Sequence, residues 1–184
     1  YGISSGALRA ALFAQKYPQF VKRVVLDAFV WTGKESPALK DRAKRFAKAK
    51  STDRRPIHSK FIRTIFSRDK HAKAAYPDVV KAFAEACCEL DDSVPNGTYI
   101  DMTRRLPVVN PRKLTVPVLI TRGEWDGIAS YEDLMEFFHL LPNPDKQFAV
   151  IPGISHASLQ MKNFQIIFHL IERFFSQPEP IYKG

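Results

Sequence analysis

The chain has 184 residues, 45% of them hydrophobic, which is enough for a domain with its own core. No run of about eighteen apolar residues occurs, so we expect no transmembrane helix and no membrane partner. The net charge of +9 is concentrated between Lys40 and Lys73, where thirteen Lys or Arg accompany three Asp. Such a segment is ordinarily a solvated face. Attraction of anionic substrates or of an acidic partner is the alternative, and nucleic acid is disfavoured.

Two neighbouring cysteines, Cys87 and Cys88, are poorly placed to bridge each other, and no His or Cys lies near enough in sequence to complete a zinc site. We interpret them as small packing side chains in a reducing compartment. We therefore expect neither a metal nor a cofactor, and we take the cytoplasm as the default location.

The first six residues read Tyr-Gly-Ile-Ser-Ser-Gly and run into a small-residue helix predicted over 6–17. Gly2 to Gly6 fits G-x-S-x-G, in which the serine sits on a strained turn between a strand and a helix. This motif makes Ser4 a candidate nucleophile. We expect both glycines to be required by the strained dihedral and by close packing of the helix on its neighbouring strands. The motif alone is weak evidence, because Gly and Ser are also common turn residues.

A mostly apolar, β-branched run over 21–31 predicts a parallel strand that is covered on both faces. From Thr32 to Pro111 the pattern becomes helical, and Ser36 followed by Pro37 indicates an N-cap. We expect no strand in this block, which we interpret as a helical cap. The division is thus core 1–31, cap 32–111 and core 112–184, with cap helices predicted over 37–50, 56–66, 77–90 and 98–106.

The α/β pattern resumes with an apolar run that starts at Leu114 and ends in a turn at Asp126. A helix is predicted over 130–141, with Ser130 as its N-cap and Asp133 in a capping-box position. A strand over 147–152 leads to a loop that contains His156. The apolar stripe over 163–176 predicts a helix laid against a sheet.

Ser4, Asp126 and His156 occur in the order of the catalytic triad of α/β-hydrolase-fold proteins, which the whole chain resembles from the nucleophile turn onward. The resemblance implies an α/β fold: part of a parallel sheet flanked by helices, with an inserted helical cap and with the N-terminal strands missing from this chain. It implies Ser4 as nucleophile, His156 as general base and Asp126 as the acid that orients it. The backbone N–H of Ser5 would be one oxyanion donor, and the second belongs to a loop outside this sequence.

Other residues compete for some of these roles. Glu124 and Asp27 are rival acids to Asp126. The remaining histidines fall on helical stretches and are interpreted as surface or packing residues. The candidates for lining a substrate pocket in or beside the cap are Trp31, Phe61, Phe66, Tyr99 and Met102.

The resemblance implies a serine hydrolase that acts on a carboxylic ester, lactone, thioester or amide through an acyl-enzyme. A carbon–carbon hydrolase or an acyltransferase would use the same three residues. A non-catalytic ligand receptor or interaction module would keep the fold. The expected partners are a small-molecule acyl substrate and the missing N-terminal half of the fold, in the same polypeptide or as a bound fragment. We expect the 184 residues alone to be inactive.

Overall fold

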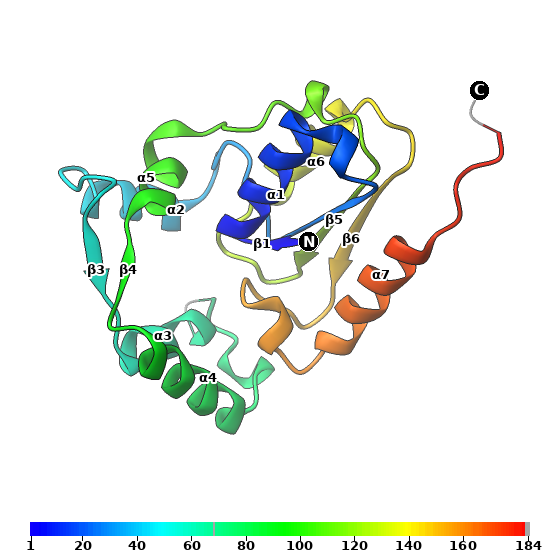
Figure 1. Cartoon of the computed structure of the whole chain (residues 1–184). Coiled ribbons are helices and arrows are strands. Elements are labelled where there is room, and N and C mark those ends of the chain that lie inside the picture. The colour runs from blue at the N-terminus through cyan, green and yellow to red at the C-terminus, as the bar shows by residue number, and fades with distance from the viewer. Residues whose placement is uncertain (68, 183–184) are drawn as a thin grey trace.

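The centre of the molecule is a four-stranded parallel sheet with the strand order β1-β2-β5-β6 (Figure 1). The computed structural model describes residues 1–67 and 69–182. Arg68 of the basic segment, and Lys183 and Gly184 at the end of the second core segment, lie outside the described residues. The strands are β1 (Gly2–Ile3), β2 (Val24–Asp27), β5 (Val118–Gly123) and β6 (Lys146–Ile151).

Helices cover both faces of this sheet, as Figure 1 shows. One face carries α1 (Ser5–Lys16) and α6 (Tyr131–Leu140), and the other carries α7 (Phe164–Ser176). Side chains of β2 alternate between the two faces: Leu26 belongs to the core on the side of α1 and α6, while Val25 packs with Phe174 of α7. Because β2 is buried on both faces, its first three residues are apolar without alternation, which explains the mostly apolar run in the sequence.

The cap lies between β2 and β5 and is drawn to one side of the sheet in Figure 1. Ser36 caps its first helix by accepting a hydrogen bond from the Leu39 N–H, as predicted. Two of the helices, α3 (Ser59–Ser67) and α4 (Pro77–Leu90), pack on the end of the core through Phe66 and Phe83. The cap helices are α2 (Pro37–Arg45), α3 (Ser59–Ser67), α4 (Pro77–Leu90) and α5 (Gly97–Ile100), and a π-helical turn (Asp101–Arg105) continues α5.

The prediction that no strand interrupts the cap is wrong. Strands β3 (Arg54–Pro56) and β4 (Ser93–Pro95) pair antiparallel, with Arg55 opposite Val94. Each is three residues long, lacks an alternating apolar pattern and carries a proline, so neither has the sequence signature of a strand. The helix predicted over 37–50 also ends early, at Arg45.

Asp133 joins the cap to the core instead of filling the predicted capping-box role. Ser130 does cap α6 by accepting a hydrogen bond from the Asp133 N–H. The Asp133 carboxylate, however, accepts hydrogen bonds from the backbone N–H groups of Thr32 and Gly33 and from the Thr32 hydroxyl. Because Asp133 is buried, these bonds are shielded from water and hold the start of the cap against α6.

Short 3-10 turns complete the described structure, at Pro18–Phe20, Ala72–Ala74, Pro111–Lys113 and Ser158–Gln160. None of the described helices combines the length and the hydropathy that crossing a membrane would require.

Candidate active site

The turn that joins β1 to α1 forces Ser4 into a backbone conformation that residues with a side chain rarely adopt, with φ 53° and ψ −118°. Its N–H donates to the carbonyl of Asp27 at 2.8 Å, and its own carbonyl accepts from the N–H of Ala7. Ser4 therefore ends the strand and begins the helix at once. A conformation of this kind costs on the order of 1–3 kcal/mol and persists only where its surroundings impose it.

The two glycines of the motif differ in their surroundings. A Cβ at Gly2 would lie 2.3 Å from the carbonyl oxygen of Gly6, so no larger residue fits there. A Cβ at Gly6 would meet no described atom within 4 Å. The positive φ falls on Ser4 and on neither glycine. The prediction that both glycines serve the strained dihedral is therefore wrong, and close packing restricts only Gly2.

Three side chains from separate loops meet at the carboxyl edge of the sheet. The Ser4 hydroxyl lies 2.8 Å from Nε2 of His156, and Nδ1 of His156 lies 3.0 Å from both carboxylate oxygens of Asp126. Ser4 follows β1, Asp126 follows β5 and His156 follows β6. Because carboxyl ends of parallel strands share one edge, residues far apart in sequence converge there.

The Asp126 carboxylate is almost fully buried, with 3% of the residue exposed. Burial by itself would raise the pKa of this carboxyl, but the charge of His156 and hydrogen bonds from His156 and from the N–H groups of Ile128 and Ala129 hold it below its ordinary value. An ionised carboxylate facing Nδ1 keeps the ring proton on that nitrogen. Nε2 is then the acceptor that faces Ser4.

The rival acids lie elsewhere. The carboxylate of Asp27 accepts hydrogen bonds from the hydroxyls of Tyr1, Thr121 and Ser158, and burial raises the pKa of this carboxyl. Glu124 accepts the backbone N–H of Gly153 at 2.9 Å. Within residues 1–67 and 69–182, the His156 ring bonds only to Ser4 and Asp126.

Asp69 is a neighbour of the site that sequence analysis did not select. It lies in the cap after α3, and its carboxylate accepts the backbone N–H of His156 at 3.2 Å. A Cβ at Gly127 would come within 2.8 Å of the same side chain, so Asp69 also contacts the turn after Asp126. The cap is thus bonded directly to the loop that carries the histidine.

A cavity of about 320 Å³ lies over Ser4. Of the five residues predicted to line it, Phe66, Tyr99 and Met102 do so. Trp31 instead donates its indole N–H to the Val109 carbonyl inside the core, and Phe61 packs against His58. Arg42 and Arg55 are among the lining residues that sequence reasoning missed, because it treated the basic segment as a solvated face.

Ser5 also lines this cavity and is the first residue of α1. The first N–H groups of a helix have no intrahelical acceptor and carry the positive end of the helix dipole. The backbone N–H of Ser5 can therefore donate to an anion formed beside Ser4. Among the described residues, no group of three or more His, Cys, Asp or Glu is arranged to bind a metal ion.

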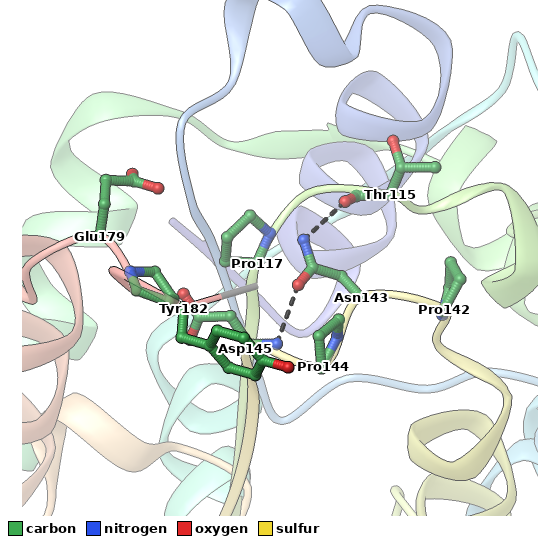
Figure 2. A pocket seen from close by; sticks show the side chains of 9 residues that line it. Thr115, Pro117, Pro142, Asn143, Pro144, Asp145, Glu179 and Tyr182 are labelled. Atoms are coloured by element: carbon green, nitrogen blue, oxygen red, sulfur yellow. Dashed lines mark hydrogen bonds between the residues drawn. The ribbon is translucent and has the colours of Figure 1, made fainter. Parts of the chain in front are cut away.

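A larger cavity of about 640 Å³ lies at the opposite edge of the sheet, beside Pro117 and Asp145, which precede β5 and β6 (Figure 2). In it the Asn143 side chain donates to the Thr115 carbonyl and accepts the N–H of Asp145. The first hydrogen bond joins the loop before β6 to the loop before β5, and the second lies within the loop before β6. The cavity shares no lining residue with the one over Ser4, so volume alone does not locate the site.

The fold and the carboxyl-edge site together define the α/β-hydrolase class. The model of the family described as serine aminopeptidase, S33, matches residues 1–162, and the chain belongs to this family. A comparison with curated proteins finds no match. The family match confirms the predicted fold class, and the family points to hydrolase activity.

Solved structures that resemble the chain include two lipases and one hydrolase. The monoacylglycerol lipase of Paleococcus ferrophilus is 20% identical, with 96% of this chain and 67% of that chain covered and a TM-score of 0.66. A soluble variant of the monoglyceride lipase of Saccharomyces cerevisiae is 15% identical, with 96% of this chain and 63% of that chain covered and a TM-score of 0.66. E-2-(acetamidomethylene)succinate hydrolase is 25% identical, with 95% of this chain and 65% of that chain covered and a TM-score of 0.63. The chain thus spans about two thirds of the length of these proteins.

Proposed function

We propose that the chain carries the catalytic residues of a serine hydrolase that cleaves a carboxylic ester, lactone, thioester or amide through an acyl-enzyme. The observation that carries the proposal is the unbroken line of contacts from the Ser4 hydroxyl through the His156 ring to the Asp126 carboxylate, at 2.8 Å and 3.0 Å. Family membership supports it. The monoacylglycerol and monoglyceride lipases among the similar structures are consistent with an ester substrate.

In the proposed reaction Oγ of Ser4 attacks the acyl carbonyl carbon while Nε2 of His156 takes the hydroxyl proton. The Asp126 carboxylate stabilises the imidazolium, and the N–H of Ser5 donates to the oxyanion. His156 then gives its proton to the leaving group as the carbon–heteroatom bond breaks. Water, deprotonated by His156, attacks the acyl-enzyme, and Ser4 recovers its proton as the acid leaves.

We further propose that the activity needs the remainder of the hydrolase fold, as part of the same polypeptide or as a bound fragment. In the described part of the chain β1 has a neighbouring strand on one side only. Three aromatic side chains in α1 or shortly after it are also exposed: Phe13, Tyr17 and Phe20. Exposed aromatic side chains are expected on a surface that another part of the fold covers. The second oxyanion donor would come from that part.

Within this proposal residues 32–111 act as a cap that limits substrate size, since Phe66, Tyr99 and Met102 stand over Ser4. The neighbouring, unbridged thiols of Cys87 and Cys88 are consistent with a reducing compartment, and we propose the cytoplasm.

The test is a fluorophosphonate probe applied to the full-length polypeptide, with the labelled peptide located by mass spectrometry. We expect labelling at Ser4 and none in Ser4→Ala, whereas Ser5→Ala, which keeps its backbone N–H, retains the label. Release of acid from a 4-nitrophenyl ester in water then separates hydrolysis from acyl transfer and from carbon–carbon cleavage. An unlabelled, folded full-length protein would refute the proposal and favour a non-catalytic receptor or interaction module.

A further inference from the structure

The cavity over Ser4 is lined by two arginines from different parts of the cap. Arg42 comes from α2 and Arg55 from β3. The described residues that line this cavity include no Asp or Glu. Two guanidinium groups therefore lie in the wall of the space beside the Ser4 hydroxyl. Its other walls are mostly apolar, which strengthens the field of the two guanidinium groups.

A single aromatic ring holds both guanidinium groups. The central guanidinium carbon lies 4.1 Å from the centroid of the Tyr99 ring in Arg42 and 3.6 Å in Arg55. The two charges are thus at most about 8 Å apart, within one Debye length at physiological salt. Stacking on the ring offsets part of their repulsion. An anion between or beside them would offset more.

Each arginine is also fixed in place by contacts with its own surroundings. Arg42 is 7% exposed, and one of its nitrogens contacts Sδ of Met102 at 3.9 Å. One terminal nitrogen of Arg55 donates to the Pro95 carbonyl at 2.8 Å and to Oδ1 of Asn96 at 3.3 Å. These bonds set the orientation of the Arg55 guanidinium before any ligand arrives, so little side-chain entropy is lost on binding.

Arg55 retains an unused donor. Its Nε–H is buried and has no hydrogen-bond partner among the described residues. No carboxylate pairs with Arg55 in that part of the chain either, whereas the preceding Arg54 forms an ion pair with Asp91. Successive side chains of a strand point to opposite faces, which explains why Arg54 faces solvent while Arg55 faces the cavity. A buried donor without a partner on a cation is costly.

We propose that Arg42 and Arg55, stacked on Tyr99, bind an anionic oxygen group, a carboxylate or a phosphate, carried by the acyl substrate at a distance from the bond that Ser4 attacks. The inference rests on the proposed hydrolase function and specifies its substrate class: anionic esters, thioesters or amides, in preference to neutral acyl chains. Planar guanidinium groups suit such anions because each can donate two parallel hydrogen bonds.

The test compares two esters of equal acyl length in the full-length polypeptide: the 4-nitrophenyl monoester of glutarate, which ends in a carboxylate, and 4-nitrophenyl pentanoate, which ends in a methyl group. We expect the native protein to have the higher kcat/KM on the glutarate ester. Arg55→Gln should lower the ratio of the two kcat/KM values at least tenfold. Arg54→Gln is the matched control on the same strand and should leave the ratio unchanged.

A binding measurement makes the two proposals separable. Isothermal titration of Ser4→Ala with glutarate monoethyl ester should show binding that weakens at least tenfold when Arg55→Gln is added. Inhibition by glutarate and by inorganic phosphate then shows which anion the pair prefers. An equal ratio in Arg55→Gln and native protein, or equal binding with and without Arg55, would overturn the anion site. Absence of hydrolysis with binding intact would overturn only the hydrolase.

Discussion

Gly123 ends β5 beside the loop that carries His156, and Gly123→Ala tests how tightly that loop is held. An added Cβ would lie 2.5 Å from the carbonyl oxygen of Ile154 and 2.6 Å from that of Ser155. Carbon–oxygen contacts ordinarily begin at about 3.3 Å, so the loop must retreat by about 0.8 Å. The backbone of Gly123 is not in the left-handed region, and the clash is therefore the only expected perturbation.

The magnitudes follow from this displacement. Forcing extra volume into a packed site costs about 1–3 kcal/mol. For a protein of this size that corresponds to a loss of about 2–12 °C in Tm. Moving a reacting group by about 1 Å costs roughly 100-fold in rate, so fluorophosphonate labelling of Ser4 should slow by about that factor.

The control is Gly97→Ala, where the added Cβ would lie 3.8 Å from the Ser51 carbonyl, an ordinary contact. Melting followed by circular dichroism and the labelling rate are measured on both variants of the full-length polypeptide. If Gly123→Ala matches Gly97→Ala in Tm and in labelling rate, the loop tolerates the displacement and the reasoning fails.

Three further predictions concern buried charges. Asp126→Asn should slow Ser4 labelling by about 10³–10⁴-fold through loss of the correct histidine tautomer; labelling within tenfold of native would contradict this. The pKa of Asp126 lies below its ordinary value of 3.8 in the folded chain. Its stabilising contribution is therefore present above the unfolded pKa and is lost as the pH falls through the folded pKa. In urea unfolding, the free energy of unfolding should fall more steeply between about pH 5 and pH 2 in native protein than in Asp126→Asn. Arg23→Met leaves Asp145, its partner at 2.7 Å with a side chain 10% exposed, without its cation and should cost about 3–5 kcal/mol in urea unfolding. Arg54→Met, in an exposed ion pair, should change the free energy of unfolding little; equal losses would show that burial does not matter here.

The candidate triad could be predicted because each of its members follows a strand that the local sequence reveals. Ser4 stands in a recognisable turn motif, and Asp126 and His156 come after apolar runs of strand length. A parallel sheet then brings the three strand ends together without further information. The choice of Asp126 over Glu124 rested on position alone, and the structure places only Asp126 against the histidine.

The cavity could not be predicted in the same way, because its charge depends on contacts between distant segments. Arg54 and Arg55 are adjacent and chemically identical in sequence, and only the pairing of β3 with β4 decides which one faces the cavity. That pairing joins short segments without a periodic pattern. Asp69 likewise reaches the His156 backbone only because the cap folds back over the core.

The position of the cap in the chain has a consequence for how proteins of this kind diversify. The chain leaves the sheet after β2 and returns to it at β5, and these two strands are hydrogen-bonded neighbours. The segment between these two strands can therefore become longer or shorter, or be replaced, during evolution without a change in the register of the sheet. Under the proposed function, new substrate preferences could arise by mutation of residues 32–111, while Ser4, Asp126 and His156 keep their places at the strand ends.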